Sequence, residues 1–344
     1  MTRIERLRAS LEEPLLITNG VNVRYLVGFS SSNAALFVEP ERVRLFSDFR
    51  YAEAARAVEG VEFVETKRSL VAALAELLEG QVGFEADAVS YSSWEVLRAG
   101  GLALVPRRGL VEALRAVKDE SELEAIRRAG EITSAAYARF AEERFVGRTE
   151  RELAWRLDKL FHEHGAHAPA FETIVASGPN SAKPHARPTD RTIEAGETIV
   201  VDAGAMVDGY NADCTRTFAT GPLPDELDTA YAATLEAQLA GLAATRAGVT
   251  GVDADAAARD KIEGAGFGAN FGHGLGHGVG LEVHEAPRLS RESGDTLGAG
   301  NVATVEPGVY LEGLGGIRIE DLVIVTDGEP EVLTSLDKEL ITVS

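Results

Sequence analysis

The chain has almost no cysteine: Cys214 is the single one among 344 residues. An intramolecular disulfide and a zinc site built from several cysteines are therefore excluded. The chain also lacks any run near the roughly 18 uncharged apolar residues that a membrane span needs. Its first residues, MTRIERLRASLEEP, are charged where the hydrophobic part of a secretory signal would lie. These absences predict a cytoplasmic protein without a membrane-spanning segment.

Positive charge is scarce, and lysine is especially rare. The 34 basic side chains face 55 acidic ones, which gives a formal net charge of -21. Such a surface repels phosphate, so nucleic acid and anionic membranes are not expected as partners. An acid-rich, lysine-poor surface is typical of proteins kept soluble in concentrated salt, where the Debye length falls to about 3 Å at 1 M. We therefore expect a halophilic source.

The length favours two domains, residues 1–118 and 119–344, each large enough for its own core. In the first domain, short apolar runs alternate with segments of helical periodicity, which predicts an α/β fold. The expected strands are PLLIT, AALFVEP, RVRLFSD and QVGFEAD, and the expected helices are FRYAEAARAVEG and SLVAALAELLEG. The sequence shows no phosphate-binding loop in this domain, which is interpreted as a scaffold or dimerisation domain.

The second domain begins with a long amphipathic helical stretch near Ala116. Ser121 and Glu124 have the spacing of a capping box, which predicts a helix start there, just after a boundary close to Lys118. A further helix is expected over 149–165, and a helix-rich interval over 224–264. Strand-like segments occupy most of the remainder, so the domain is predicted to be α+β with a mostly antiparallel, curved sheet.

Two acidic residues are expected to converge across a hairpin. In VVDAGAMVDGYNADCTRT, the dipeptide Asp208-Gly209 is a strong turn signal between two apolar strands. A turn there places Gly204 opposite Asp213 and makes Asp202 a diagonal neighbour on the same face. Two acids in an apolar setting repel each other unless a cation lies between them.

A second pair of acids follows the same logic. Glu306 and Glu320 lie in two apolar segments joined by a glycine-rich turn, and their even separation allows them to share a face. Asp321 has the opposite parity and is expected to face solvent. Arg318 shares the parity of Glu320, which suits an arginine that orients metal-binding carboxylates.

A histidine-rich segment, GHGLGHGVGLEVHEAP, holds three of the seven histidines. They could be metal ligands, proton carriers or ordinary residues of a glycine-rich segment. The alternating glycines do not fit a dinucleotide-binding loop and instead indicate close approach of another backbone. Four acids with one or two imidazoles suit Mn²⁺, Co²⁺, Fe²⁺ or Zn²⁺. Their charge is enough for two such ions, which can activate water for hydrolysis.

Two other features are interpreted as inert. His162, His164 and His167 lie at a predicted helix end, where imidazoles suit the helix dipole without a metal. Cys214 follows Asp213 directly, so strand parity turns its thiol to the opposite face, and we expect it to be buried.

The segments DAGAMVDGYNAD with TRT, GHGLGHGVGLEVHE, TVEPGVY and GIRIED, in this order, resemble the pita-bread metallopeptidases, in particular the prolidases and aminopeptidases P. NVRYLVGFSSSNAALFV and SDFRYAEAA resemble the creatinase/prolidase-type N-terminal domain, which methionine aminopeptidases usually lack. The resemblance implies two divalent metal ions and a homodimer. The implied metal ligands are Asp202, Asp213, His277, Glu306 and Glu320.

The same resemblance implies roles for four more residues. His185, His273 and His284 would line the substrate site, hold the substrate carbonyl and pass protons to the leaving proline nitrogen. Arg288 would grip a substrate carboxylate, with a plain surface arginine as the alternative. The implied activity is hydrolysis of the Xaa-Pro bond of short peptides by a metal-bridging hydroxide. Prolidase and aminopeptidase P specificities both remain open, as do another aminopeptidase specificity, a non-catalytic binding protein on this fold and a creatinase-type enzyme.

The acid-rich composition generates a prediction about salt. We expect the thermal unfolding midpoint to rise steeply between low and molar salt, because screening weakens repulsion among the acidic side chains. Scanning calorimetry across a salt series measures this. A midpoint indifferent to salt would contradict a halophilic origin.

Overall fold

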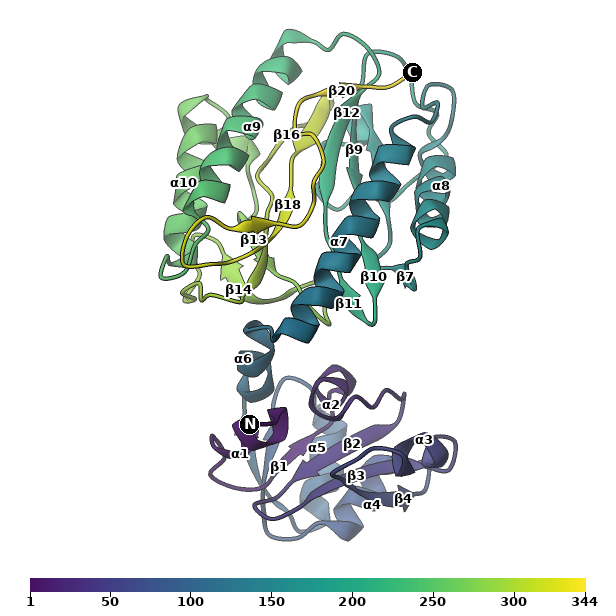
Figure 1. The fold of residues 1–344 in the computed structure, drawn as a ribbon, viewed down its shortest axis with the longest axis vertical. Helices are drawn as coiled ribbons and strands as arrows, with labels where there is room; N and C mark the ends of the chain where they lie inside the picture. Colours follow the sequence, from purple (N-terminus) through teal and green to yellow (C-terminus); the bar gives the residue numbers. More distant parts are fainter. The chain divides into compact units, whose positions relative to one another are not determined.

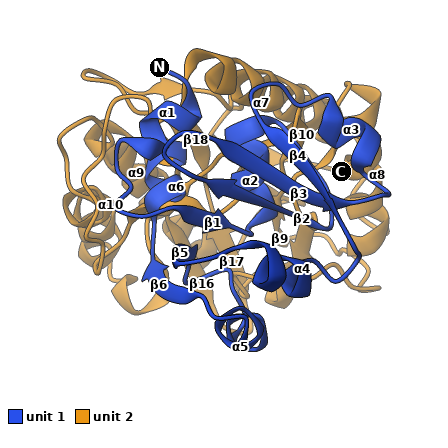
Figure 2. Ribbon diagram, turned by 90° about the horizontal axis from the view of Figure 1, so that it is seen from below, with its two compact units in different colours: residues 1–115 blue, residues 116–344 orange.

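The computed structural model describes residues 1–344, whose contacts divide into two compact units, Met1–Arg115 and Ala116–Ser344 (Figure 2). The expected domains, 1–118 and 119–344, differ from these units by a few residues. The predicted fold class is confirmed: an α/β unit is followed by an α+β unit with mostly antiparallel sheets. None of the helices combines the length and the apolar character that a membrane-spanning helix needs.

Unit 1 is built on one six-stranded mixed sheet in the order β4-β3-β2-β1-β5-β6. Its strands β1 to β3 pair antiparallel, while β4, β5 and β6 join in parallel. The strands are β1 Leu15–Ile17, β2 Ala34–Val38, β3 Val43–Asp48, β4 Glu62–Thr66, β5 Gln81–Glu85 and β6 Ala103–Arg107. The helices are α1 Arg3–Arg8, α2 Gly20–Val27, α3 Ala52–Arg56, α4 Leu70–Leu77, α5 Tyr91–Ala99 and α6 Leu110–Ala116, whose last residue is the first of unit 2. The expected alternation of strands and helices is therefore present.

In unit 2, small, mostly antiparallel sheets lie between two pairs of helices, with α7 and α8 on one side and α9 and α10 on the other (Figure 1). The helices are α7 Glu120–Phe140, α8 Glu150–Glu163, α9 Asp225–Ala244 and α10 Gly251–Gly264. The strands are β7 Ala168–Pro169, β8 Ile174–Ser177, β9 Thr198–Asp202, β10 Ala205–Val207, β11 Tyr210–Asn211, β12 Thr215–Ala219, β13 Gly276–Gly278, β14 Glu285–Leu289, β15 Val302–Val305, β16 Gly308–Leu311, β17 Gly315–Arg318, β18 Asp321–Ile324, β19 Glu331–Val332 and β20 Ile341–Thr342.

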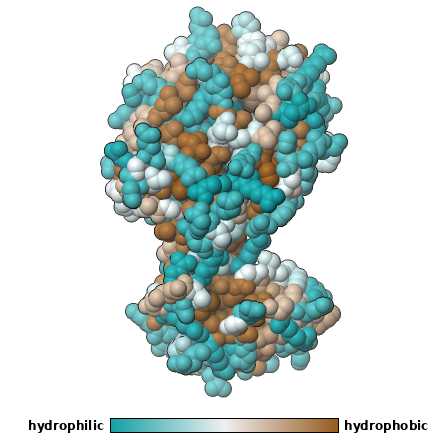
Figure 3. Space-filling view, viewed as in Figure 1, coloured by the Kyte–Doolittle hydropathy of each residue, from teal (hydrophilic) through white to brown (hydrophobic).

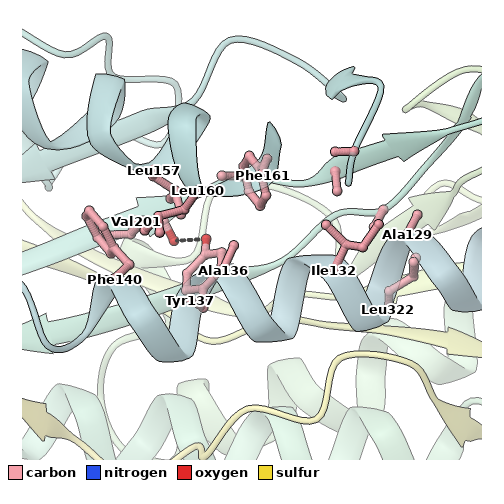
Figure 4. Packing of buried hydrophobic residues seen from close by; sticks show 14 of the residues in the cluster. Ala129, Ile132, Ala136, Tyr137, Phe140, Leu157, Leu160, Phe161, Val201 and Leu322 are labelled. Carbon is pink, nitrogen blue, oxygen red and sulfur yellow. Dashed lines mark hydrogen bonds between the residues drawn. The ribbon is translucent and has the colours of Figure 1, made fainter. Parts of the chain in front are cut away.

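Each helix pair covers its own apolar core. Tyr137 of α7 is buried in the core beneath α7 and α8, and its hydroxyl lies within hydrogen-bonding distance of the carbonyl oxygen of Val201 (3.1 Å; Figure 4) and of that of Cys214 (2.7 Å). It thus ties the helix to β9 and to the residue before β12. The second core joins α9 and α10 to the opposite side of the sheets. On the face of unit 2 drawn in Figure 3, hydrophobic residues occur in separate groups among hydrophilic ones.

Helix α7 starts earlier than predicted. Asp119 is the N-cap, and its side chain and that of Glu122 form a capping box with the backbone of the other residue. The expected box of Ser121 and Glu124 is therefore wrong. Asp119 with Glu122 and Ser121 with Glu124 have the same three-residue spacing, so both pairs match the capping-box pattern. In the structure, the hydroxyl of Ser121 donates to the Asp119 carboxylate at 2.6 Å.

The predicted hairpin at Asp208-Gly209 is confirmed. Both turn residues have positive φ, 49° and 76°, as a tight two-residue turn requires. Met206 pairs with Asn211 and Asp202 pairs with Thr215, so one register runs through both ladders. This register sets Gly204 opposite Asp213, as expected.

The second hairpin also keeps its register across an interruption. Val305 pairs with Asp321, and Gly308 pairs with Arg318. Glu306 and Glu320 lie in the short gap between these two ladders. The hairpin therefore carries both glutamates at the same level, as predicted from their separation.

Asp321 is not on the solvent side, which corrects the prediction. It is fully buried, and its carboxylate binds Arg216 at 2.8 Å and Lys338 at 2.6 Å, besides accepting a hydrogen bond from Gln238. The prediction that Asp321 and Glu320 point to opposite faces of the sheet was correct. Both faces of this sheet are covered, however, so the opposite face is a second interior with its own ion pairs.

The alternating glycines do permit close backbone approach. A Cβ added at Gly276 would lie 2.1 Å from the carbonyl oxygen of Thr304, and one at Gly278 would lie 2.1 Å from that of Ala286. No side chain fits at either distance, so β13 can lie between β14 and β15 only with glycine at these positions.

The packing of α7 gives a stability prediction. A Cβ added at Gly130 would lie 2.6 Å from the carbonyl oxygen of Leu333, so Gly130→Ala should lower the free energy of unfolding by about 1–3 kcal/mol through overpacking. Gly264→Ala in α10 is the matched control, because nothing lies within 4 Å of its added Cβ. Urea denaturation measures both variants. Equal stability of the two alanine variants would contradict the prediction.

Candidate active site

The five residues expected as metal ligands come together in unit 2. They line one cavity of about 470 Å³. Asp202 ends β9, Asp213 lies between β11 and β12, His277 is in β13, Glu306 follows β15 and Glu320 precedes β18. The two hairpins and the glycine-rich strand thus each contribute donor atoms to the same space.

The donor atoms lie close to one another. Asp202, Asp213 and Glu320 each offer a carboxylate oxygen, and these atoms lie within 4.8 Å of one another. The Nε2 atom of His277 lies 3.2 Å from Glu306 Oε1 and 3.7 Å from Asp213 Oδ2. The imidazole therefore bridges this carboxylate group and Glu306.

The electrostatics of the cluster reflect crowded negative charge. Burial raises the pKa of Asp213 and of Glu320 well above the usual range, and neighbouring carboxylates raise each pKa further. Burial also raises the pKa of Asp202, against the effect of the Arg318 charge. Without added positive charge, these groups would therefore favour protonation.

His277 and Glu306 behave as an ion pair. Burial alone would raise the pKa of Glu306, but the hydrogen bond and charge of His277 lower it to about 2. Burial alone would lower the pKa of His277, but Glu306 raises it to about 9. A proton on His277 thus occupies a position that a cation could take.

Two carboxylate oxygens support a metal-binding interpretation. Asp202 Oδ1 and Glu320 Oε1 are buried and have no hydrogen-bond partner. A buried charged oxygen without a partner is costly unless a cation binds it. Carboxylates with one imidazole are also the donor set that Mn²⁺, Co²⁺, Fe²⁺ and Zn²⁺ accept. The residues present therefore fit divalent metal ions.

Arg318 lies beside this cluster, where an orienting arginine was expected. Its Nη2 atom donates to Asp202 Oδ2 at 2.5 Å. The Nε atom donates to the hydroxyl of Thr215 at 2.9 Å, and that hydroxyl donates to Glu320 Oε2 at 2.7 Å. One buried guanidinium therefore fixes a carboxylate from each hairpin, directly for Asp202 and through Thr215 for Glu320.

The three expected substrate-site histidines also line the cavity, together with the metal-ligand candidates. His273 Nδ1 lies 2.8 Å from the carbonyl of Gly274, and its Nε2 lies 3.0 Å from the Tyr310 hydroxyl. The ring of His284 lies 4.3 Å from that of His277, between centroids. Burial lowers the pKa of both His273 and His284, which favours neutral imidazoles that can exchange a proton.

Sequence reasoning missed several residues that line the cavity or contact its lining. Tyr310 links Arg318, whose Nη1 atom is 3.0 Å from its hydroxyl, to His273. Thr215 lies within the TRT segment, directly opposite Asp202, and this register could have indicated it. An apolar wall had no comparable sequence signal, since its members come from separate segments: Phe171, Ile174, Pro184 and Val283.

Arg288 is not brought into the site. It lies in β14, its side chain is exposed, and it is not among the residues that line the cavity. Its backbone N–H donates to Asp295. The expected grip on a substrate carboxylate has no support from this position.

The residues interpreted as inert are not among those that line the cavity. His162, His164 and His167 are exposed at the end of α8 and beyond it, and they form no metal-binding group. Cys214 is buried, and burial raises the pKa of its thiol far above the usual range. A thiol held protonated in this way is a poor nucleophile.

The contact of Thr215 gives a prediction about metal binding. Thr215→Val removes the hydroxyl that connects Glu320 to Arg318, so we expect the affinity for Mn²⁺ to fall about 10–100-fold. Isothermal titration of the metal-free protein measures it. Thr234→Val is the matched control, because this buried hydroxyl bonds only its own helix, to the carbonyl of Ala230. Equal affinity in both variants would contradict the role given to Thr215.

Comparison with known proteins agrees with this geometry. Residues 124–327 match the metallopeptidase family M24, and residues 3–117 match the creatinase/prolidase N-terminal domain. The chain is 38% identical over 232 residues to an Xaa-Pro dipeptidase of Pyrococcus furiosus, covering 67% of each chain. A solved Xaa-Pro dipeptidase from Bacillus anthracis is 38% identical and superposes with a TM-score of 0.95 over 99% of both chains.

A solved X-Pro aminopeptidase from Thermotoga maritima is also similar, with 36% identity and a TM-score of 0.88 over 99% of this chain and 100% of that one. Both units are therefore matched, in their natural order, by one family architecture. The chain belongs to metallopeptidase family M24 and is a metallo-exopeptidase with a creatinase/prolidase-type N-terminal domain.

Proposed function

We propose that this enzyme hydrolyses the Xaa-Pro bond of short peptides. One observation carries the proposal: two buried carboxylate oxygens without partners, Asp202 Oδ1 and Glu320 Oε1, lie in a cavity that also holds three further candidate ligands, one of them His277, and three other histidines. Its relatives include an Xaa-Pro dipeptidase and an X-Pro aminopeptidase. A bond to proline is a tertiary amide without an N–H, so it needs a dedicated site.

The metal ligands in this proposal are Asp202, Asp213, His277, Glu306 and Glu320. Two divalent ions held there, Mn²⁺ or Co²⁺ foremost and Zn²⁺ or Fe²⁺ as alternatives, would polarise the substrate carbonyl and supply a nucleophile at neutral pH. One of the two glutamates would accept the proton of the attacking water. Arg318 would keep Asp202 and, through Thr215, Glu320 in place throughout.

The histidines act on the substrate in this proposal. His185, His273 and His284 border the cavity, so they can donate hydrogen bonds to the substrate carbonyl and to the oxygen that becomes negative during attack. The leaving proline nitrogen must gain a proton, and a histidine at the cavity supplies it. Phe171, Ile174 and Val283 offer an apolar wall against which a proline ring can pack.

Dipeptidase and aminopeptidase P activities differ only in substrate length here. Arg288 is not among the residues that line the cavity, so its position does not support a grip on a dipeptide carboxylate. Because Arg288 lies outside the cavity lining, Xaa-Pro-Yaa peptides remain candidate substrates together with Xaa-Pro dipeptides. A non-catalytic binding protein is disfavoured because every candidate ligand is present, and a creatinase-type enzyme is disfavoured by the same set.

The setting of the enzyme is part of the proposal. We propose a cytoplasmic homodimer that tolerates high salt, on the basis of the acidic composition and of the family resemblance. Light scattering at low and molar salt measures the oligomeric state.

The activity is tested with metal removal and a substrate panel. We expect a chelator to abolish hydrolysis of Xaa-Pro peptides, and Mn²⁺ or Co²⁺ to restore it, because the proposed nucleophile depends on the metal ions. Xaa-Pro, Xaa-Pro-Yaa and matched Xaa-Ala peptides are compared at low and high salt. Activity that survives chelation, or equal turnover of Xaa-Ala peptides, would refute the proposal.

Two variants complete this panel. His284→Ala should bind Mn²⁺ normally and lose turnover, since His284 is a substrate-side residue. Arg288→Ala should leave the ratio of Xaa-Pro to Xaa-Pro-Yaa turnover unchanged, given its position outside the cavity. A selective loss of dipeptide turnover in this second variant would instead assign the carboxylate grip to Arg288.

A further inference from the structure

Glu150 is a buried carboxylate that the proposed reaction does not use. It is the first residue of α8 and is fully buried, and its hydrogen bonds come from uncharged groups. A buried carboxylate without an ion-pair partner is costly unless several donors satisfy both of its oxygens. The donors around Glu150 meet this requirement, and all of them come from one segment.

The two oxygens of Glu150 bind opposite ends of the segment 177–189. Oε1 accepts from the backbone N–H (2.7 Å) and the hydroxyl (2.9 Å) of Ser177. Oε2 accepts from the backbone N–H (2.9 Å) and the hydroxyl (2.6 Å) of Thr189. The side-chain amide of Asn180 donates to both oxygens, at 3.2 and 2.9 Å. One carboxylate thus closes the segment into a loop.

The far end of this loop reaches the catalytic cavity. Pro184 and His185 line the cavity, and the carbonyl of Pro184 accepts a hydrogen bond from Arg318 Nη1 at 3.1 Å. The hydroxyl of Ser181 accepts from the backbone N–H of Gly316 at 2.8 Å. The loop is therefore held at both ends by Glu150 and near its tip by the guanidinium that also binds Asp202.

The start of α8 does not depend on Glu150. Thr149 is the N-cap, and its side chain and that of Glu152 form a capping box with each other's backbone N–H groups. The contacts of Glu150 instead leave the helix altogether and bind the loop. Helix initiation and loop closure can therefore be perturbed separately, by changing Glu152 or Glu150.

We propose that Glu150 is a positioning residue for His185: by binding both ends of segment 177–189, it fixes the loop that presents this histidine to the substrate. The inference rests on the proposed function, because the role of His185 is part of that proposal. The proposal also requires that both oxygens of residue 150 accept hydrogen bonds, as only a carboxylate can. Glutamine has the size of glutamate, but its amide group is a donor that would face the donors of Ser177 or Thr189.

The experiment compares Glu150→Gln with the control Glu152→Gln in the Mn²⁺-loaded protein. Hydrogen–deuterium exchange read by mass spectrometry should show faster exchange in segment 177–189 for Glu150→Gln alone. This variant should lose at least tenfold in kcat for an Xaa-Pro peptide while its affinity for Mn²⁺ stays within about twofold. Exchange in this segment that matches the wild type would overturn the proposal, whatever the activity.

A double variant separates positioning from a general structural role. If Glu150 acts through His185, then Glu150→Gln combined with His185→Ala should be no slower than His185→Ala alone. A further loss by the full factor of the single variant would overturn the proposal. Thr189→Val removes one hydroxyl donor and keeps the Glu150 carboxylate, so it should change hydrogen exchange and kcat in the same direction as Glu150→Gln, but by a smaller amount. It replaces Glu150→Gln in the test if that variant does not fold.

Failure of the proposed function has a different signature. A wild-type protein that hydrolyses no Xaa-Pro peptide, or a His185→Ala variant with full activity, would refute that function or the role of His185 in it. The exchange measurement needs no substrate, so it still decides whether Glu150 fixes the loop.

Discussion

Negative charge concentrated in one buried cavity is the constraint on which the catalytic unit depends. Asp202, Asp213, Glu306 and Glu320 would repel one another without positive charge between them. Arg318 and His277 offset only part of this charge, and two carboxylate oxygens are left without partners. In the proposed function, cations complete this arrangement, so stability and catalysis would depend on the same electrostatic balance.

Much of this site could be predicted from local pattern. The turn at Asp208-Gly209 fixes a register, and a register fixes which side chains share a face; this placed Asp202 near Asp213. The even separation of Glu306 and Glu320 worked in the same way. Which residues bind metal and which face the substrate did not follow from spacing, and the assignment of His277 as against His273 and His284 came from resemblance to a family.

What the sequence could not supply depends on contacts between distant segments. Asp321 was expected in solvent, because parity gives a direction but not what covers that face. Tyr310 ends the segment TVEPGVY but had no role assigned to it, and Glu150 lies in no quoted motif; the importance of both comes from partners brought near by the fold. The start of α7 was misplaced because two capping signals overlap and only the packed helix selects between them. Tertiary contact therefore accounts for these misses.

The glycines of β13 are required for folding and not for catalysis. With carbonyl oxygens 2.1 Å from where a Cβ would be at Gly276 and Gly278, any substitution must displace a neighbouring strand. One neighbour leads into Glu306, and the other follows His284. A descendant that gave up peptide hydrolysis would still need both glycines to fold. In a related protein, retained glycines at these positions would thus indicate common ancestry, whereas the acids and histidines around them would indicate whether it still has the same function.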